Sequence, residues 1–218
     1  MKKIILLLAF VTSLMGAISA NAEEITILRD DFDEDVLSPS DWTITISPGS
    51  AFFELKNSKL ILHTTPDIGV GTAVVRSNKS FSVLNGALIF KSRIVDTYVD
   101  HAIYGDAQPR GLVAGEDRNN AIEFISALPV PNTVECRTVA NGAVTSTIVD
   151  LGQSVRVPNV YQIVAKPNIV KFYINGRRVA THTTNIPTVP LNVYFSTGDS
   201  GAGNVPVEID YVSFERNN

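Results

Sequence analysis

The sequence predicts an all-β fold, an antiparallel β-sandwich, and three observations support this prediction. Short segments rich in β-branched residues, with apolar and polar residues in alternation, recur along most of the chain. Gly, Pro, Asn and Asp separate these segments at intervals of about 8–12 residues, which is typical of sandwiches and barrels. Apolar residues are not sustained at spacings of three and four, so helices are not expected.

The first 22 residues have the three parts of a secretion signal. Lys2 and Lys3 form the positive start, an apolar run extends to Met15, and the small residues of 20–22 suit a signal peptidase. The apolar run is shorter than the ~20 residues that a membrane span needs, and polar residues interrupt it. We therefore predict a signal peptide at 1–22, export to the periplasm or the outside, and a single mature domain at 23–218 without a membrane span.

Composition narrows the classes of partner. The chain has 22 acidic and 18 basic residues, a net charge of −4. This mild acidity argues against nucleic-acid binding. Cys136 is the only cysteine, so no disulfide forms within the chain, and its alternation with Val134 predicts a buried structural thiol.

The predicted strands follow from the alternating segments, taken in order. They are 24–29, 42–47, 52–56, 59–64, 71–76, 87–95, 111–114, 121–127, 133–140, 143–151, 161–166, 169–175, 177–183, 191–196 and 207–214. Two Asn-Gly pairs, at 141–142 and 175–176, predict hairpins with two-residue type I′ turns, because both residues accept positive φ angles. In the second hairpin, the register pairs Phe172 with Val179 on the buried face and Tyr173 with Arg178 on the other.

Five segments occur in an order known from one superfamily. They are RDDFD at 29–33, FELKNSKLIL at 53–62, the stretch 80–94, VKFYINGRRV at 170–179 and EIDYV at 208–212. Together they resemble the concanavalin A-like lectin/glucanase superfamily, and within it the laminarinase and lichenase type of glycoside hydrolase. The resemblance implies a jelly-roll β-sandwich of two curved antiparallel sheets.

The resemblance also implies where catalysis would reside. Retaining glucanases of this type carry E-x-D-x-x-E, because their reaction needs two carboxylates ~5–5.5 Å apart. The matching segment here is AIEFIS at 121–126, where Ala121 and Ser126 stand at the two catalytic positions and Glu123 stands at the central Asp. None of the other nearby carboxylates lies two or three strand residues away on the same face: Glu116, Asp117 and Glu135. The sequence thus predicts that the paired catalytic glutamates are missing.

Ligand-binding candidates follow from the same comparison. Glu123 with Arg93 or Arg137 from other strands would form a polar patch in the concave groove, where carboxylate and guanidinium groups suit hydroxyl-rich ligands. Tyr173, on the non-core face of its hairpin, is a candidate aromatic platform. The alternative is a solvated strand face with a cross-strand salt bridge.

A structural calcium ion is the one cofactor that the resemblance implies. Its matching ligands are Asp31, in the acidic run after the first strand, and Asp210 in the closing strand. Calcium takes six to eight oxygens, which carboxylates and backbone carbonyls supply. Ordinary surface charge is the alternative.

Three functions remain open at this point. The first is an exported, lectin-like domain that binds a glycan without glucanase catalysis. The second is a glycoside hydrolase or another polysaccharide-active enzyme on the same fold. The third is a structural or adhesive surface module, since a fold does not determine a function.

Overall fold

The computed structural model describes residues 24–46, 51–64, 72–95, 99–104, 119–126, 132–152, 157–198 and 206–217. The predicted signal peptide and the predicted strand at 111–114 lie outside these residues. Among the described residues, no helix is long and apolar enough to cross a membrane.

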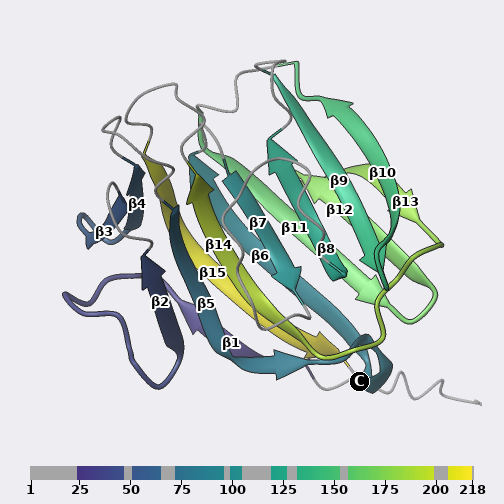
Figure 1. The fold of residues 1–218 in the computed structure, drawn as a ribbon, viewed down its shortest axis with the longest axis horizontal. Coiled ribbons are helices and arrows are strands. Elements are labelled where there is room, and N and C mark those ends of the chain that lie inside the picture. Colours follow the sequence, from purple (N-terminus) through teal and green to yellow (C-terminus); the bar gives the residue numbers. More distant parts are fainter. Residues whose placement is uncertain are drawn as a thin grey trace, which may run out of the picture.

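Within the described ranges, the first sheet has eight strands, all antiparallel to their neighbours (Figure 1). In spatial order they are β13 (Arg177–His182), β12 (Ile169–Ile174), β11 (Asn159–Lys166), β6 (Ala87–Val95), β15 (Val207–Asn217), β4 (Leu60–Thr64) and β3 (Ala51–Leu55), with β1 (Glu24–Asp30) also paired to β15. A single 3₁₀ turn, η1 (Val83–Asn85), precedes β6.

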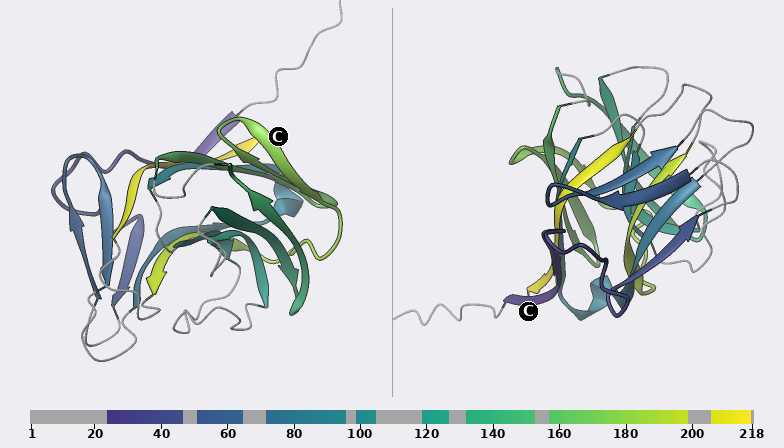
Figure 2. Two further views of the ribbon diagram at one scale, coloured as in Figure 1. Left: turned by 90° about the horizontal axis from the view of Figure 1, so that it is seen from above. Right: turned by 90° about the vertical axis from the view of Figure 1, so that its left-hand side faces the viewer.

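The second sheet has seven antiparallel strands among the residues that the structure describes. In spatial order they are β10 (Ala143–Asp150), β9 (Thr133–Ala140), β8 (Asn120–Ser126), β7 (Val99–Tyr104), β14 (Leu191–Gly198), β5 (Thr72–Phe81) and β2 (Trp42–Ile46). Figure 2 shows the two sheets stacked and curved in the same sense, so that the outer face of this second sheet is concave. The predicted jelly-roll sandwich of two curved antiparallel sheets is confirmed.

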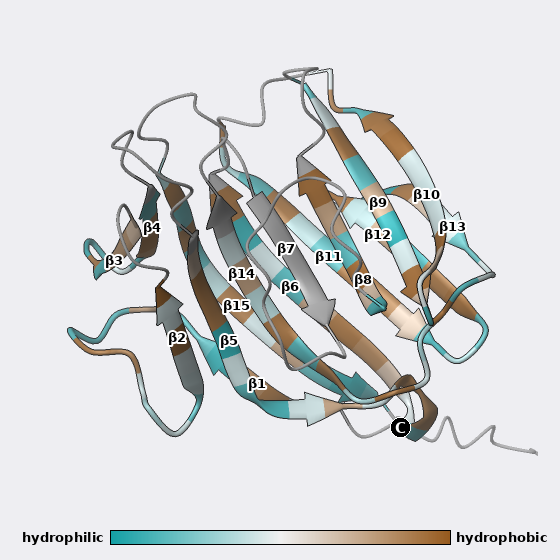
Figure 3. Cartoon of the chain, viewed as in Figure 1, coloured by the Kyte–Doolittle hydropathy of each residue, from teal (hydrophilic) through white to brown (hydrophobic). Residues whose placement is uncertain are grey.

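The core lies between the two sheets and follows from the alternation in the sequence. Hydrophobic and hydrophilic residues alternate along strands such as β9 and β11 (Figure 3), and the apolar ones point inward. The largest fully buried side chains include Phe90, Phe124, Tyr161, Phe172 and Phe195. Phe124 of the second sheet packs edge-on against Tyr161 and Phe172 of the first, with ring centroids 5.1 and 5.3 Å apart.

Two strand segments differ most from the prediction. Strand β7 was not predicted, because Asp100 and His101 interrupt the apolar pattern and no turn residue marks its start. Strand β5 continues to Phe81, past the predicted end at residue 76, although the added residues 77–80 are polar. Pairing with β14 accounts for this extension. The pairing contains a register shift between Asn192 and Tyr194 of β14.

Both predicted hairpins form. Positive φ angles of 51° at Asn141 and 80° at Gly142 join β9 to β10, and angles of 51° and 78° at 175–176 join β12 to β13. The pairing of Tyr173 with Arg178 is confirmed. The pairing of Phe172 with Val179 is wrong, because an irregularity in β13 places Ala180 opposite Phe172.

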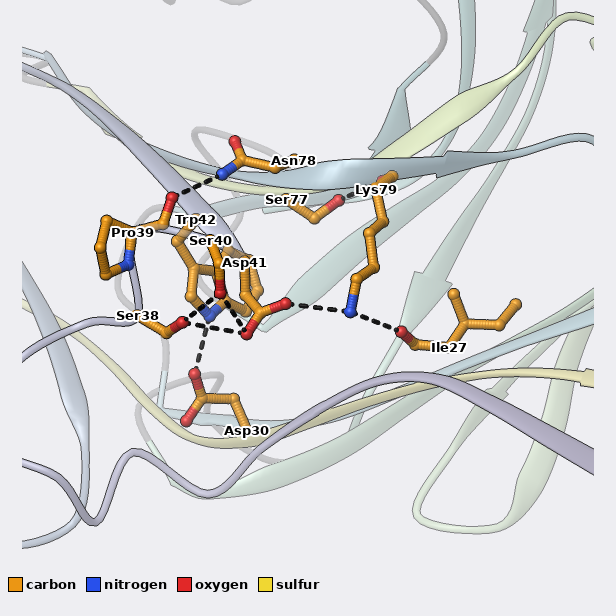
Figure 4. A network of polar contacts seen from close by, with 10 residues as sticks. All are labelled: Ile27, Asp30, Ser38, Pro39, Ser40, Asp41, Trp42, Ser77, Asn78 and Lys79. Carbon is orange, nitrogen blue, oxygen red and sulfur yellow. Dashed lines mark hydrogen bonds and ion pairs between the residues drawn. The ribbon is translucent and has the colours of Figure 1, made fainter.

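A polar network joins the two sheets at the edge formed by β2 (Figure 4). The indole of Trp42 donates a 2.7 Å hydrogen bond to Asp30 of β1, in the opposite sheet. Lys79 of β5 forms a 3.0 Å ion pair with Asp41 and a 3.5 Å hydrogen bond to the carbonyl of Ile27. The Lys79 ammonium, helped by the Ser38 hydroxyl, holds the pKa of Asp41 below its usual value. Polar groups therefore close this edge of the sandwich.

A buried histidine joins the sheets at the opposite edge. His182 of β13 is 3% exposed, and its two ring nitrogens lie 3.1 and 3.0 Å from the hydroxyls of Thr138 and Thr147 in the other sheet. Burial lowers the pKa of His182 below 6.5, so the neutral ring is the form that the folded protein holds.

This histidine predicts a loss of stability in mild acid. Below about pH 6.5 the unfolded chain takes up a proton that folded His182 resists, so the free energy of unfolding falls as the pH falls, by up to ~1.4 kcal/mol per pH unit. His182→Asn keeps a polar group but does not titrate. We expect a shallower slope for this variant in urea unfolding between pH 5 and 6.5, and equal slopes would contradict the prediction.

The prediction of a buried structural thiol is confirmed. Cys136 is fully buried, and its alternation with the outward-facing residues of β9 places it in the core. Burial, and to a smaller extent the charge of Glu135, raises its pKa far above the usual range. Cys136 is therefore a packing residue, not a reactive group.

Candidate functional site

Strand β8 places one carboxylate on the concave face of the second sheet. Ile122 and Phe124 belong to the core, so alternation turns Ala121 and Glu123 to the outer, concave side. Glu123 is fully buried there. A buried carboxylate is costly unless a cation or hydrogen-bond donors compensate its charge, so its neighbours determine what this site is able to do.

The neighbouring strand β9 supplies both a cation and a second carboxylate. Arg137 lies directly opposite Glu123 in the register, and Glu135 lies opposite Ile125, two residues along. The Arg137 Nε lies 3.4 Å from Oε1 of Glu123 and 3.8 Å from Oε1 of Glu135. Both distances end on the same nitrogen, so the two carboxylate oxygens are at most about 7 Å apart, the sum of these distances. The side chains of Arg137 and Glu135 are 17% and 26% exposed.

Glu123 is therefore not a lone carboxylate on this face. The glucanase pattern places the second carboxylate two or three residues away on the same strand, whereas Glu135 comes from the next strand. The alternation of Glu135 and Arg137 with Val134 and Cys136 already indicated that the two charges share a face. What the sequence lacked was the register between β8 and β9.

Apolar and hydroxyl groups extend this face across the sheet. Tyr194 of β14 is in register with Glu123, with Ala102 of β7 between them. Four buried residues form a small apolar cluster outside the main core: Val74, Ala121, Val139 and Tyr194. Ser196, two residues after Tyr194 on the same face, is fully buried. The concave face thus combines a charged centre with an apolar and hydroxyl-bearing flank.

Two other predicted binding residues lie on the opposite sheet. Arg93 is in β6 and forms a 2.6 Å ion pair with Asp210 of β15, so it does not share a groove with Glu123. Tyr173 is in β12, where Phe172 and Ile174 face the core and Tyr173 faces outward from the convex sheet. Of the predicted set, the structure brings only Glu123 and Arg137 together.

The predicted calcium ligands do not form a donor set for a cation. Asp31 pairs with Arg29 at 3.3 Å, and Asp210 pairs with Arg93 at 2.6 Å. Among the described residues, no group of three or more Asp, Glu, His or Cys side chains is arranged to hold a metal ion. Carboxylates that already hold guanidinium groups fit calcium poorly, since calcium needs six to eight oxygens.

The resemblance predicts calcium binding, whereas the ion pairs of Asp31 and Asp210 argue against it, and thermal unfolding decides between the two. From the ion pairs of Asp31 and Asp210 we expect the same melting temperature, within about 1 °C, in millimolar CaCl₂ and in EDTA, because only a ligand bound to the folded state raises it. A rise of several degrees in calcium that Asp210→Asn removes would contradict this expectation.

Comparisons with known proteins show which solved structures share this fold. No protein-family model matches the sequence, and a search of curated proteins finds no match. Solved structures do match. A β-glucanase from Bacillus licheniformis superposes with a TM-score of 0.66 at 17% identity, over 86% of this chain and 96% of that one. The laminarinase catalytic domain from Thermotoga maritima gives 0.66 at 11% identity, over 90% and 99%.

A κ-carrageenase from Pseudoalteromonas carrageenovora, solved in complex with an oligotetrasaccharide of κ-carrageenan, gives a TM-score of 0.61 at 14% identity, over 94% of this chain and 100% of that one. Identities this low show the fold alone. These structural neighbours are glycoside hydrolases. The chain therefore has the jelly-roll β-sandwich fold of these β-glucanase and laminarinase structures.

Proposed function

We propose that this protein is a glycoside hydrolase that binds a glycan chain along the concave face and uses Glu123 and Glu135 as its carboxylate pair. The observation that supports the proposal most is the shared position of the two side chains beside Arg137, with their oxygens at most about 7 Å apart. Glycoside hydrolysis uses two carboxyl groups ~5–5.5 Å apart when configuration is retained and ~6.5–9.5 Å apart when it is inverted. A separation of at most about 7 Å fits the spacing of retaining enzymes and the lower part of the range of inverting enzymes.

The chemistry assigns one task to each carboxyl group. One protonates the glycosidic oxygen of the leaving sugar, while the other attacks the anomeric carbon or removes a proton from the attacking water. Glu135 is the more exposed of the two, so it is the first that a substrate entering the face meets. Arg137 lies within ion-pair distance of both side chains, and we assign it the role of a positioning residue.

Export belongs to the same proposal. The first 22 residues have the features of a secretion signal, which suits an enzyme that acts on polysaccharides outside the cytoplasm. We propose that the mature domain acts in the periplasm or outside the cell.

Glycan binding without hydrolysis is the second candidate, and one observation favours it. A guanidinium between two carboxylates is also the arrangement of a structural ion-pair network, and Glu123 is fully buried within it. Such a network would stiffen a binding surface and leave no carboxyl group for proton transfer.

One assay separates the two candidates. The purified mature protein is incubated with β-glucans, galactans and carrageenans, and the release of reducing ends is measured beside binding by affinity electrophoresis. We expect hydrolysis of at least one polysaccharide by the wild type and a loss of about 10³-fold or more in Glu123→Gln and Glu135→Gln, with binding retained. Glu54→Gln, a carboxylate of β3 in the other sheet, is the matched control and should keep full activity.

Binding without release of reducing ends would support the second candidate. Hydrolysis that survives in both variants would contradict the assignment of the carboxylates.

A further inference from the structure

We propose that a cavity at the open edge of the sandwich binds a small anion, a carboxylate or sulfate group on a short and partly apolar body. The cavity has a volume of about 280 Å³ and lies between the end of β10 in one sheet and the β12–β13 hairpin in the other. These strands form the right-hand edges of the two sheets in Figure 1. The lining includes no residue of the carboxylate pair, so this proposal does not rest on the proposed hydrolase function.

Two arginine side chains bring positive charge to the cavity, and no carboxylate forms an ion pair with them among the described residues. Arg177 and Arg178 both line the cavity and are exposed, and within the described part of the chain neither side chain forms an ion pair or hydrogen bond. The one acidic lining residue, Asp150, already accepts a 2.9 Å hydrogen bond from the backbone N–H of Gly152. The cavity therefore has a net positive charge in a protein whose total charge is −4.

The local backbone explains why two neighbouring arginines reach one cavity. Successive residues of a regular strand point to opposite faces. Here Arg177 directly follows the Asn-Gly turn, and the irregular pairing between Tyr173–Arg178 and Phe172–Ala180 disturbs the alternation at the same place. Two guanidinium groups side by side present planar N–H donors that match the oxygens of a carboxylate or sulfate in pairs.

The walls of the cavity are held in place before any ligand arrives. Asn175 donates a 2.8 Å hydrogen bond to Asn159 and accepts one of 2.8 Å from the backbone of Val160. Asn159 in turn donates to the carbonyl of Val157 at 3.0 Å. Because these amides are already fixed, a ligand loses little free energy to ordering them.

The floor of the cavity is apolar. It is formed by Ile174, which belongs to the main core, and by three aliphatic side chains that pack against that core: Val149, Leu151 and Val179. An anion held at the arginines would therefore place a non-polar surface, such as one face of a sugar ring or a short alkyl chain, against this floor. A volume of about 280 Å³ limits that body to the size of one monosaccharide or a six-carbon acid.

Titration with small probes tests this site. Sodium glucuronate and sodium hexanoate share a carboxylate, but one carries a sugar ring and the other an alkyl chain. Glucose is the uncharged counterpart of glucuronate. Binding is followed by NMR shifts of the backbone amides of β10, β12 and β13 on the full mature chain. We expect at least one carboxylate to bind with a millimolar dissociation constant and glucose to cause no saturable shift at the same concentration.

Two double variants complete the experiment. Arg177→Gln/Arg178→Gln should weaken binding about tenfold or more. Lys166→Gln/Lys171→Gln removes the same charge from other positions of the same sheet. This control should change the dissociation constant of the probe by less than about twofold. A preference for glucuronate or for hexanoate shows whether the apolar part of the ligand is a sugar ring or an alkyl chain, and both results support the site. Absence of saturation by both carboxylates, or equal weakening in the two double variants at unchanged melting temperature, would overturn the proposal.

Discussion

Replacing Phe124 with alanine is expected to lower the free energy of unfolding by about 3–5 kcal/mol. Phe124 is fully buried on β8 and packs edge-on against Tyr161 and Phe172 of the opposite sheet. Truncation removes buried apolar surface and leaves a cavity at the contact between the sheets, where the curved strands have little freedom to close it. Urea unfolding monitored by circular dichroism measures the effect.

Ile148→Ala is the matched control for this prediction. Ile148 is 67% exposed on β10, at the edge of the same sheet, so its truncation should cost less than about 0.5 kcal/mol. A loss below about 1 kcal/mol in Phe124→Ala would show that the two sheets do not pack at this position.

Replacing Arg137 with leucine is expected to have a second large effect, a loss of about 3 kcal/mol at pH 7. Leucine approximates the packing of the aliphatic stem but removes the cation beside buried Glu123 and half-buried Glu135. Breaking a buried ion pair by removing one partner is costly, because the remaining charge stays in a poorly solvated place.

A double-mutant cycle tests the physical cause of this effect. Arg137→Leu/Glu123→Gln removes both the cation and the buried charge, so it should be more stable at pH 7 than Arg137→Leu alone. If Glu123→Gln lowers the free energy of unfolding by the same amount in Arg137→Leu as in the wild type, the two side chains do not interact. The proposed centre of the concave face would then be wrong.

Most of the fold was readable from the sequence because its signals are local. Alternation and turn residues are properties of short segments, so the strands before and after Asn141-Gly142 and Asn175-Gly176 were predicted closely. Strand β7 was missed because Asp100 and His101 break its pattern, and its place between β8 and β14 depends on pairing with both neighbours. The register of Phe172 was missed for a related reason, since an irregularity in β13 leaves no mark in the composition.

The site was less predictable because it depends on contacts between strands. Glu123 and Arg137 were both identified, but Arg93 and Tyr173 were placed with them although they belong to the opposite sheet. Spacing along the sequence separates Glu135 from Glu123, because it relates residues of one strand and not residues that face each other across two strands. Residues in contact across a sheet are related by register, and the register of two strands joined by a longer connection is a tertiary property.

The most direct test of the central claim is a crystal structure of the Glu123→Gln variant with an oligosaccharide of the polysaccharide that the wild type binds. The proposal predicts that the sugar chain lies along the concave face, with a glycosidic oxygen or anomeric carbon within about 3.5 Å of the side chains at 123 or 135. A chain bound instead over the convex sheet, or one on the concave face that contacts neither position, would contradict it.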